Sequence, residues 1–232
     1  MELKDKVLDL DINLSDAQLN KFEEYYKFLV EYNEKVNLTA ITEHDEVMIK
    51  HFYDSLILSK VLYPGKIKLL DVGAGAGFPS VPNAIINDML DVTIIDSLNK
   101  RIVFLEELIK KLGLKNVKPI HGRAEEYAIE NREKFDVVTA RAVARLNILI
   151  ELCIPFVKVG GLFVAMKSKE GEEELNEALN GIGLLGGKVI DRMDFELPNG
   201  MGERELILIK KIKPTPNKYP RKFAQIKSKP LK

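Results

Sequence analysis

Three glycines and two aspartates stand at spacings typical of a nucleoside-binding site. Residues 69–77 read Leu-Leu-Asp-Val-Gly-Ala-Gly-Ala-Gly, and Asp96 closes the next apolar run. Because Gly73, Gly75 and Gly77 have no β-carbon, a ligand can approach the backbone closely. The Asp96 carboxylate can accept hydrogen bonds from two ribose hydroxyls. We therefore expect a nucleoside at the carboxyl edge of a parallel sheet, where open α/β folds bind such ligands.

The glycine spacing helps to choose between two nucleoside cofactors. A dinucleotide site favours Gly-x-Gly-x-x-Gly, whereas this loop is Gly-x-Gly-x-Gly with Asp71 two residues before the first glycine. An acid there can hold an ammonium group, which S-adenosylmethionine carries and NAD lacks. The motif favours S-adenosylmethionine, and an NAD-dependent oxidoreductase stays open as an alternative. A glycine turn without any ligand is disfavoured, because acids stand on both sides of it.

The composition is that of one large domain, or of one domain with an extension. The chain has 232 residues, of which 46% are hydrophobic, and it has one cysteine and three histidines. It contains no run of about 18 apolar residues and opens without a signal-peptide pattern. Cys153 lies among apolar residues and is expected to be a buried thiol. We expect a cytoplasmic protein with no membrane contact and no metal site.

The net charge of zero hides a basic end. Residues 210–232 hold nine Lys or Arg residues and no acid. Four prolines stiffen this segment, and Tyr219 and Phe223 offer stacking surfaces, which favours contact with a polyanion over a frayed end. We divide the chain into a helical extension over residues 1–64, a catalytic domain over residues 65–211 and a basic tail over residues 212–232.

Hydrophobic periodicity predicts helices first and then an alternation of strands and helices. A capping box at Ser15 should open a helix that breaks at Asn37, and a second helix should run over residues 43–62. The expected strands cover residues 67–72, 92–96, 117–120, 135–139, 162–167, 189–195 and 205–211. The expected helices between them cover residues 80–87, a segment capped by Ser97 that ends at Gly113, a short one from Ala124, and residues 146–156 and 170–179. Five β-α units followed by two joined strands predict an α/β, Rossmann-like, seven-stranded and mostly parallel sheet with an antiparallel edge hairpin.

This layout is that of a class I adenosylmethionine-dependent methyltransferase, and the residues limit the chemistry. Methylation of a pyrimidine carbon needs a nucleophile, usually a cysteine, but Cys153 lies within an expected helix. Amino-group methyltransferases often place Asn/Asp-Pro-Pro-Tyr after the fourth strand, where this chain has Thr-Ala-Arg-Ala at residues 139–142. A ring nitrogen with a free lone pair, such as guanine N7, carries no proton and needs no base. Orientation alone supplies much of the acceleration for such an acceptor.

An ordered set of motifs resembles the small-subunit (16S) ribosomal RNA methyltransferase G family, also called glucose-inhibited division protein B. The resemblance runs from about residue 20 to residue 220. It rests on the segments at residues 37–40, 51–56, 71–79, 96–101, 123–125 and 140–142, which read NLTA, HFYDSL, DVGAGAGFP, DSLNKR, RAE and ARA. It implies N7 methylation of one guanine in the 530 loop of 16S ribosomal RNA in bacteria. Because a free RNA loop is mobile, we expect the substrate to be a small ribosomal subunit or an assembly intermediate. Ser80 departs from the pattern, since many members have glycine there.

The resemblance also implies roles for single residues. Gly73 and Phe78 would line the cofactor pocket and Asp96 would hold the ribose. Ala124 and Glu125 would flank the adenine, and Arg141 would lie at the catalytic edge. Together with the loop and its neighbours, the expected cofactor-binding set is Asp71, Gly73, Gly75, Gly77, Phe78, Asp96, Ser97, Ala124, Glu125 and Arg141.

Three cations follow strand ends and are the candidate catalytic residues. Arg123, Arg141 and Lys167 stand at the expected ligand edge, where they could contact RNA phosphate or a displaced base; surface ion pairs are the other interpretation. His121 follows a strand without an evident partner and is given no role.

His51, Asp54 and Ser55 contain the letters of a hydrolase triad. They fall within five residues on one expected helix, so a structural role or contact with the cofactor domain is favoured.

Three other functions stay open, namely methylation of another RNA or of a small molecule, NAD-dependent oxidation, and RNA binding without catalysis. We expect a monomer.

Overall fold

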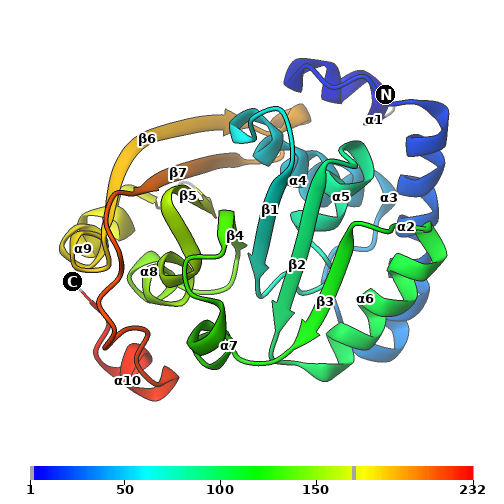
Figure 1. Cartoon of the computed structure of the whole chain (residues 1–232). Coiled ribbons are helices and arrows are strands. Elements are labelled where there is room, and N and C mark those ends of the chain that lie inside the picture. Colours follow the sequence, from blue (N-terminus) through cyan, green and yellow to red (C-terminus); the bar gives the residue numbers. More distant parts are fainter. Residues whose placement is uncertain (1–2, 169–170, 232) are drawn as a thin grey trace.

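A computed structural model describes residues 3–168 and 171–231. Figure 1 shows a central sheet with helices on both faces. The strands are β1 (Ile67–Val72), β2 (Leu90–Asp96), β3 (Val117–His121), β4 (Phe135–Arg141), β5 (Val157–Lys167), β6 (Gly187–Glu196) and β7 (Glu203–Lys211). The α-helices are α1 (Leu3–Lys6), α2 (Asp16–Val36), α3 (His44–Val47), α4 (Asp54–Leu56), α5 (Ser80–Ile86), α6 (Asn99–Leu112), α7 (Ala124–Asn131), α8 (Leu146–Cys153), α9 (Gly171–Leu184) and α10 (Phe223–Ser228). Other helical turns are η1 (Val7–Leu10), η2 (Met48–Tyr53), η3 (Ile57–Val61), η4 (Ile154–Phe156) and η5 (Pro198–Gly200).

The strand order places a ligand edge at the centre of the sheet. The order is β3-β2-β1-β4-β5-β7-β6, and β7 pairs antiparallel with both β5 and β6. The order reverses between β1 and β4, so the loops after these two strands diverge and leave a crevice at their carboxyl ends. The predicted seven-stranded, mostly parallel sheet with an antiparallel hairpin at one edge is confirmed.

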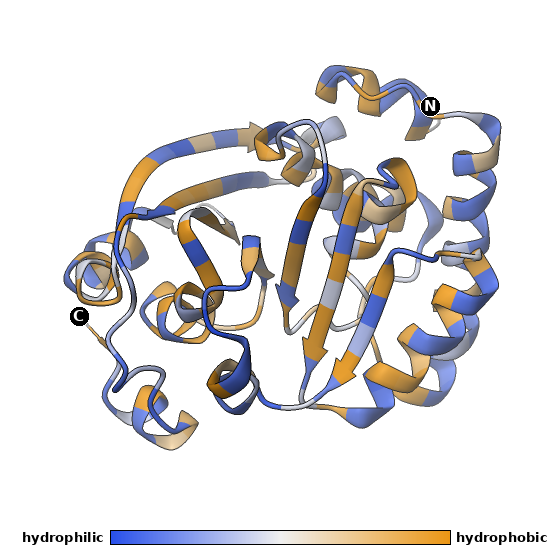
Figure 2. Ribbon diagram, viewed as in Figure 1, coloured by the Kyte–Doolittle hydropathy of each residue, from blue (hydrophilic) through white to orange (hydrophobic). Residues whose placement is uncertain are grey.

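Alternate residues of the central strands build two separate cores. Leu69 of β1 packs with the N-terminal helices, α5 and α6, whereas Leu70 packs on the other face with α8 and α9. This period of two is the side-chain alternation of a strand. Figure 2 shows the hydrophobic residues that run along the central strands. Because both faces are covered, the loop after β1 is held between two packed layers.

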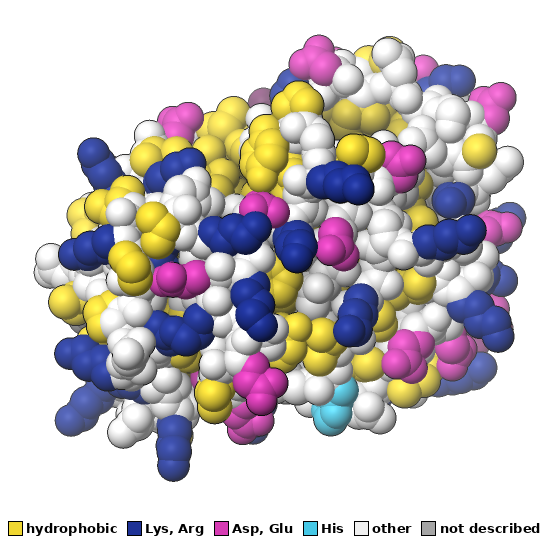
Figure 3. Space-filling model, in the orientation of Figure 1, with side chains coloured by type: hydrophobic (Ala, Val, Ile, Leu, Met, Phe, Trp, Pro, Cys, Tyr) yellow, Lys and Arg dark blue, Asp and Glu magenta, His cyan; other side chains and the backbone are white. Residues whose placement is uncertain are grey.

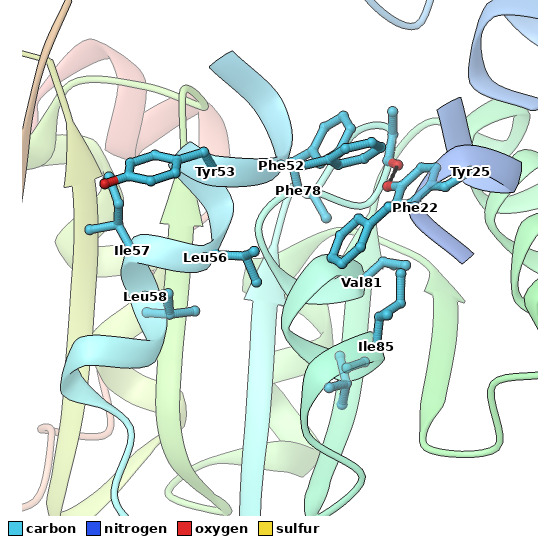
Figure 4. Close-up of a cluster of buried hydrophobic side chains, with 14 of the residues drawn as sticks. Phe22, Tyr25, Phe52, Tyr53, Leu56, Ile57, Leu58, Phe78, Val81 and Ile85 are labelled. Carbon is cyan, nitrogen blue, oxygen red and sulfur yellow. Dashed lines mark hydrogen bonds between the residues drawn. The ribbon is translucent and has the colours of Figure 1, made fainter. Parts of the chain in front are cut away.

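The N-terminal helices form part of the first core. Helix α2 opens with the predicted capping box at Ser15 and ends before Asn37, which has a φ of 49°. Phe22 and Tyr25 of this helix pack against Phe52 of η2, with ring centroids 5.1 and 5.0 Å away. Figure 4 shows these rings beside Phe78 of the glycine loop. The extension is therefore packed directly against the segment expected to bind the cofactor.

The expected helix over residues 43–62 is helical throughout but changes its winding. It passes from α3 into η2, which is a π-helical turn, then into α4 and the 3-10 turn η3. A π-helical turn admits one extra residue and reorients the side chains that follow it, and such turns are frequent at functional sites. Here the turn contains Lys50 and His51 and leads directly into Asp54.

Other boundaries differ from the expected ones by a few residues. Helix α6 begins at Asn99 with Leu98 as its N-cap, so the prediction that Ser97 caps it is wrong. Strand β5 starts at Val157 rather than residue 162, and the helix before it gives way to the 3-10 turn η4, whose second residue is Pro155. Helix α9 continues to Leu184. Its expected first residue, Glu170, lies outside the described residues.

The basic tail packs against the body of the protein. Arg221 donates to the fully buried carboxylate of Glu151 from its backbone N–H (2.7 Å), from Nε (2.9 Å) and from Nη2 (2.6 Å). Ile226 of α10 is fully buried, and Arg132 donates to the carbonyls of Thr215 and Tyr219. Figure 1 shows α10 beside α7 at the carboxyl edge of the sheet. Part of the tail's positive charge thus holds the tail in place.

We predict that Arg221→Ala lowers the free energy of unfolding by about 3 kcal/mol, because it leaves the buried Glu151 carboxylate without its charged partner. Urea denaturation followed by circular dichroism measures the change. Lys222→Ala, at the exposed neighbouring position, is the matched control and should stay within about 0.5 kcal/mol of the parent. Equal stability of the Arg221 variant and the control would contradict this account of the tail.

Candidate functional site

Two adjoining cavities open at the carboxyl edge of the sheet. The first, of about 400 Å³, lies over the loop after β1, and the second, of about 350 Å³, lies between η2, β5 and β7. They share His51, Arg141 and Ala142. The first is lined by Leu38, Thr39, His51, Val72, Gly73, Ala74, Gly75, Ala76, Phe78, Ile95, Asp96, Ser97, Arg101, Gly122, Arg123, Ala124, Glu125, Arg141, Ala142, Val143, Leu152 and Phe223.

The three glycines of the loop have three different surroundings. A β-carbon on Gly75, which has a φ of +60°, would meet nothing within 4 Å, and this residue lines the first cavity. A β-carbon on Gly73 would lie 2.8 Å from a methyl group of Val143. Gly77 does not line the cavity. The absence of a side chain there makes room for the hydroxyl of Tyr25 and for Val81. Gly73 and Gly75 are therefore placed where they could contact a ligand, as predicted, whereas Gly77 has a packing role.

The Asp96 carboxylate lies at the cavity wall in a dense set of hydrogen bonds. Its Oδ2 accepts from the Gly75 N–H (3.2 Å) and from Arg101 Nη1 (3.1 Å), and its Oδ1 accepts from the Leu98 N–H (2.9 Å). The side chain is 2% exposed. This carboxylate ties the glycine loop to the end of β2 and leaves a fixed negative group at the cavity, as a ribose site needs.

Asp71 is fully buried and does not line either of the two cavities. Its Oδ2 accepts from the Ser80 N–H (3.2 Å), and within the described part of the chain its Oδ1 has no hydrogen-bond partner. Burial raises the pKa of this carboxyl to about 7, against hydrogen bonds from Ser80 that lower it. This buried position outside both cavities disfavours the predicted direct contact of Asp71 with a ligand's ammonium group. The residue supports the loop from beneath and joins it to the start of α5.

A column of stacked groups runs from α2 to the boundary between the cavities. The ring of Phe78 stacks on Tyr25 (5.4 Å between centroids) and on His51 (4.6 Å), and the Arg141 guanidinium carbon lies 5.0 Å from its centroid. The Tyr25 hydroxyl donates to the carbonyl of Ala76 at 2.5 Å. Burial raises the pKa of Tyr25 well above its usual range. This hydroxyl therefore stays protonated and can only hold the loop.

Arg141 is held on a buried carboxylate that it shares with a second arginine. Its Nη1 donates to Asp54 Oδ2 (2.7 Å) and to the carbonyl of Lys50 (3.2 Å), and Arg204 Nε lies 3.2 Å from Asp54 Oδ1. The Arg141 side chain is 14% exposed. Asp54 thus joins the helical extension to both β4 and β7, and the predicted contact of this segment with the cofactor domain is confirmed.

His51 is poised as a neutral ring. Burial, and then the neighbouring Arg141 charge, lower its pKa to about 4. Its Nε2 lies 2.8 Å from Thr39 Oγ1 and its Nδ1 lies 3.4 Å from Arg141 Nη2. Ser55 Oγ donates to the backbone carbonyl of His51 and not to its ring. His51, Asp54 and Ser55 therefore do not form a nucleophile relay, which agrees with the prediction from the sequence.

The other two predicted cations have unlike environments. Lys167 Nζ pairs with Glu174 Oε2 (2.6 Å), donates to the carbonyl of Ala144 (3.0 Å) and lines the second cavity at 12% exposure. Arg123 is 54% exposed at the mouth of the first cavity, 3.6 Å from Glu125 Oε1. Of the three candidates for phosphate contact, only Arg123 has an exposed charge. Arg141 and Lys167 instead form ion pairs with Asp54 and Glu174, which is the other interpretation that the sequence left open for them.

The residues present fit S-adenosylmethionine. The cavity places an open glycine face, a fixed carboxylate and the residues Ser97, Ala124 and Glu125 around one space. Sequence reasoning missed Leu38, Thr39, Arg101, Val143 and Phe223 as lining residues, and Lys50, Asp54, Glu174 and Arg204 in the second cavity. The Asn33 side chain, which bonds to both backbone groups of Thr39, positions that loop. The motif at residues 37–40 was the one available signal for it.

The described residues form neither a metal-ligand cluster nor a membrane-spanning helix. Among them, no three acidic, histidine or cysteine side chains gather as a metal site would need, and no helix is both long and apolar enough to cross a membrane. Cys153 is a buried free thiol, as predicted.

Solved structures and curated relatives place this arrangement among known proteins. A SAM-dependent methyltransferase from Aquifex aeolicus superposes with a TM-score of 0.53 at 18% identity, over 75% of this chain and 96% of that one. The complex of P. horikoshii TYW2 with MeSAdo gives 0.55 at 16% identity, over 69% and 63%. These matches confirm the predicted class I methyltransferase fold.

The sequence matches are closer. The family model "rRNA small subunit methyltransferase G" (GidB) matches residues 18–196. The ribosomal RNA small subunit methyltransferase G of Staphylococcus saprophyticus is 56% identical over 222 residues, 95% of this chain and 93% of that protein. The protein of the same name from Lactococcus lactis subsp. lactis is 52% identical over 235 residues, 100% of this chain and 98% of that protein. Matched by the family model over most of its length and more than half identical to these relatives, the chain belongs to the rRNA small subunit methyltransferase G family.

Proposed function

We propose that the protein transfers a methyl group from S-adenosylmethionine to N7 of a guanine in the 530 loop of 16S ribosomal RNA. The observation that carries the proposal is the pair of cavities that meet at Arg141. One has the features of a nucleoside cofactor site. The other is lined by Lys50, Arg141, Lys167 and Arg204 together with the carboxylates of Asp54 and Glu174, and it has room for a base taken out of its stack. Family membership supports the ribosomal substrate and disfavours the oxidoreductase and the non-catalytic RNA-binding module.

The cofactor, when bound, supplies an electrophilic methyl group on a sulfonium. Gly73, Gly75 and Asp96 would hold it in the first cavity, Asp96 through the ribose. Asp71 keeps the loop fixed from beneath, and Phe78 forms a rigid wall between Tyr25 and His51. The protein's contribution is a preformed space in which little must rearrange, and such orientation supplies much of the acceleration in a direct transfer.

No side chain has to act as a base, because guanine N7 carries no proton. The titratable groups near Arg141 agree with this. The low pKa of His51 keeps its ring neutral, but both ring nitrogens already contact other side chains, namely Thr39 and Arg141. The Asp54 carboxylate is already paired with two arginines. Arg141 is the positioning residue, since it lines both cavities and is fixed on three sides.

The RNA would approach across the exposed basic groups around the cavity mouth. Figure 3 shows Lys and Arg side chains projecting where α10 lies. Lys222, the N-cap of α10, and Lys227 within it are exposed, as is Lys218 in the segment before them, and Arg123 lines the first cavity at 54% exposure. We propose that the substrate is the small ribosomal subunit or an assembly intermediate, that the enzyme acts as a monomer, and that it acts in the cytoplasm, where ribosomes assemble.

The direct test is a map of modified positions in 16S RNA. Small subunits that lack the modification are incubated with the enzyme and S-adenosylmethionine labelled in the methyl group. A single label at guanine N7 in the 530 loop is the expected result. A label on another atom or another RNA, or labelling of small molecules alone, would refute the proposed substrate.

We predict that Arg141→Ala lowers single-turnover methylation of small subunits by about 100-fold, the size of loss that a displaced positioning group causes. Cofactor affinity, measured by calorimetry, should fall much less. Arg145→Ala is the control, because Arg145 pairs with Glu177 outside both cavities. Unchanged turnover in the Arg141 variant would remove it from the mechanism.

We predict that subunit affinity falls steeply with salt, as phosphate contacts require. Replacing Lys218, Lys222 and Lys227 together by Gln should weaken subunit binding and reduce the salt slope by about 1 for each lysine in contact. Lys66→Gln, at the exposed opposite edge of the sheet, should change neither. A salt-independent affinity would favour a small neutral substrate, the main rival within enzymes.

A further inference from the structure

The C-terminal tail contributes an aromatic side chain to the cofactor cavity. Phe223, the first residue of α10, lines this cavity together with the residues of the glycine loop and of the α7 start. It lies beyond residue 196, where the match to the family model ends. Neither the glycine motif nor the expected β-α units point to this residue.

Phe223 is held in place by contacts on both sides of it in the chain. Two residues before it, Arg221 donates from its backbone N–H, Nε and Nη2 to the buried carboxylate of Glu151 of α8. Three residues after it, Ile226 is fully buried within the second core. Half-buried between these anchors, the Phe223 ring is brought to the cavity by a fixed segment, and Figure 1 shows that segment beside α7.

The ring lies beside Arg123 in the wall of the cavity. The guanidinium carbon of Arg123 is 5.9 Å from its centroid, and Arg123 directly precedes Ala124 and Glu125, which line the same cavity. Asp96, the ribose-binding candidate, closes β2, and Gly122 beside it donates to its backbone carbonyl at 3.1 Å. The base of a nucleoside held at Asp96 would therefore extend toward Ala124, Glu125 and Phe223. An aromatic face there suits a purine ring.

We propose that Phe223 is a cofactor-binding residue that packs against the adenine of S-adenosylmethionine, so that the docked tail forms one wall of the cofactor site. The proposal rests on the cofactor assignment but not on which RNA atom receives the methyl group. It also assigns the Arg221–Glu151 anchor a second effect, since that pair holds the ring where the ligand meets it.

The first test measures ligand affinity by calorimetry in the absence of RNA. Phe223→Ala should weaken S-adenosylmethionine binding about tenfold, and Phe223→Tyr should restore most of the affinity, as expected for a lost aromatic contact. 5′-Methylthioadenosine, which keeps the base but lacks the amino acid part, should lose affinity by a similar factor. Gln225→Ala, at an exposed position of the same helix, should bind both ligands as the parent does. Unchanged affinity in Phe223→Ala, or an equal loss in the Gln225 control, would overturn the proposal.

A second test does not depend on the stability of the alanine variant. The chain contains no tryptophan, so Phe223→Trp introduces a single fluorophore at the proposed contact. Its emission should shift on titration with S-adenosylmethionine, whereas Tyr63→Trp, at an exposed position before β1, should not respond. A silent Phe223→Trp that still binds the ligand by calorimetry would overturn the proposal. Binding with the expected shift, but without methylation of small subunits, would instead refute the proposed RNA function and leave this assignment standing.

Discussion

The buried carboxylate of Asp54 is the contact on which the site depends. It receives Arg141 from β4 and Arg204 from β7, at 2.7 and 3.2 Å. Removal of a charge from water is costly unless the charge is paired, so the burial of Asp54 depends on the two arginines. The N-terminal helices, the parallel part of the sheet and the antiparallel hairpin are joined at this one group, which lines the second cavity.

The glycine loop is fixed in the same way by groups that are themselves fixed. Asp96 holds the Gly75 N–H from β2, the Tyr25 hydroxyl holds the Ala76 carbonyl from α2, and Asp71 holds the Ser80 N–H from beneath. Two of these contacts come from neighbouring strands of the sheet and the third comes from the helical extension. A cofactor site built so is preformed, and its shape depends on the helical extension as much as on the sheet. The extension is therefore part of the site.

Local patterns were sufficient to predict the sheet, the glycine loop and the position of Asp96 at the end of a strand. Strand alternation and glycine spacing are properties of a few neighbouring residues, and they are readable without knowledge of the rest of the chain. Pairings such as Arg141 with Asp54, 87 residues apart, leave no such local signal. Phosphate contact is predicted for Arg141 and Lys167 because the sequence indicates that they follow strand ends, but it does not indicate their acidic partners. Only the folded chain shows which cations are already neutralised.

The π-helical turn at residues 48–53 and the docked tail were beyond sequence reasoning for a related reason. The hydrophobic periodicity of residues 43–62 fits a regular helix. Within the turn, Phe52 packs against Phe22, Tyr25 and Phe78, which local periodicity does not reveal as its partners. In the tail, a run of basic residues is typical of a solvated end. Its docking depends on Glu151 and Arg132, which lie far from the tail in the chain.

The shared aspartate also bears on how the catalytic unit can be divided. A fragment that begins at β1 would keep all seven strands and the glycine loop, yet it would carry two arginines whose counter-charge had been removed with the excised helices. A domain boundary drawn at the start of the sheet is therefore in the wrong place: the smallest self-sufficient piece of this enzyme has to include helix α4, which carries Asp54.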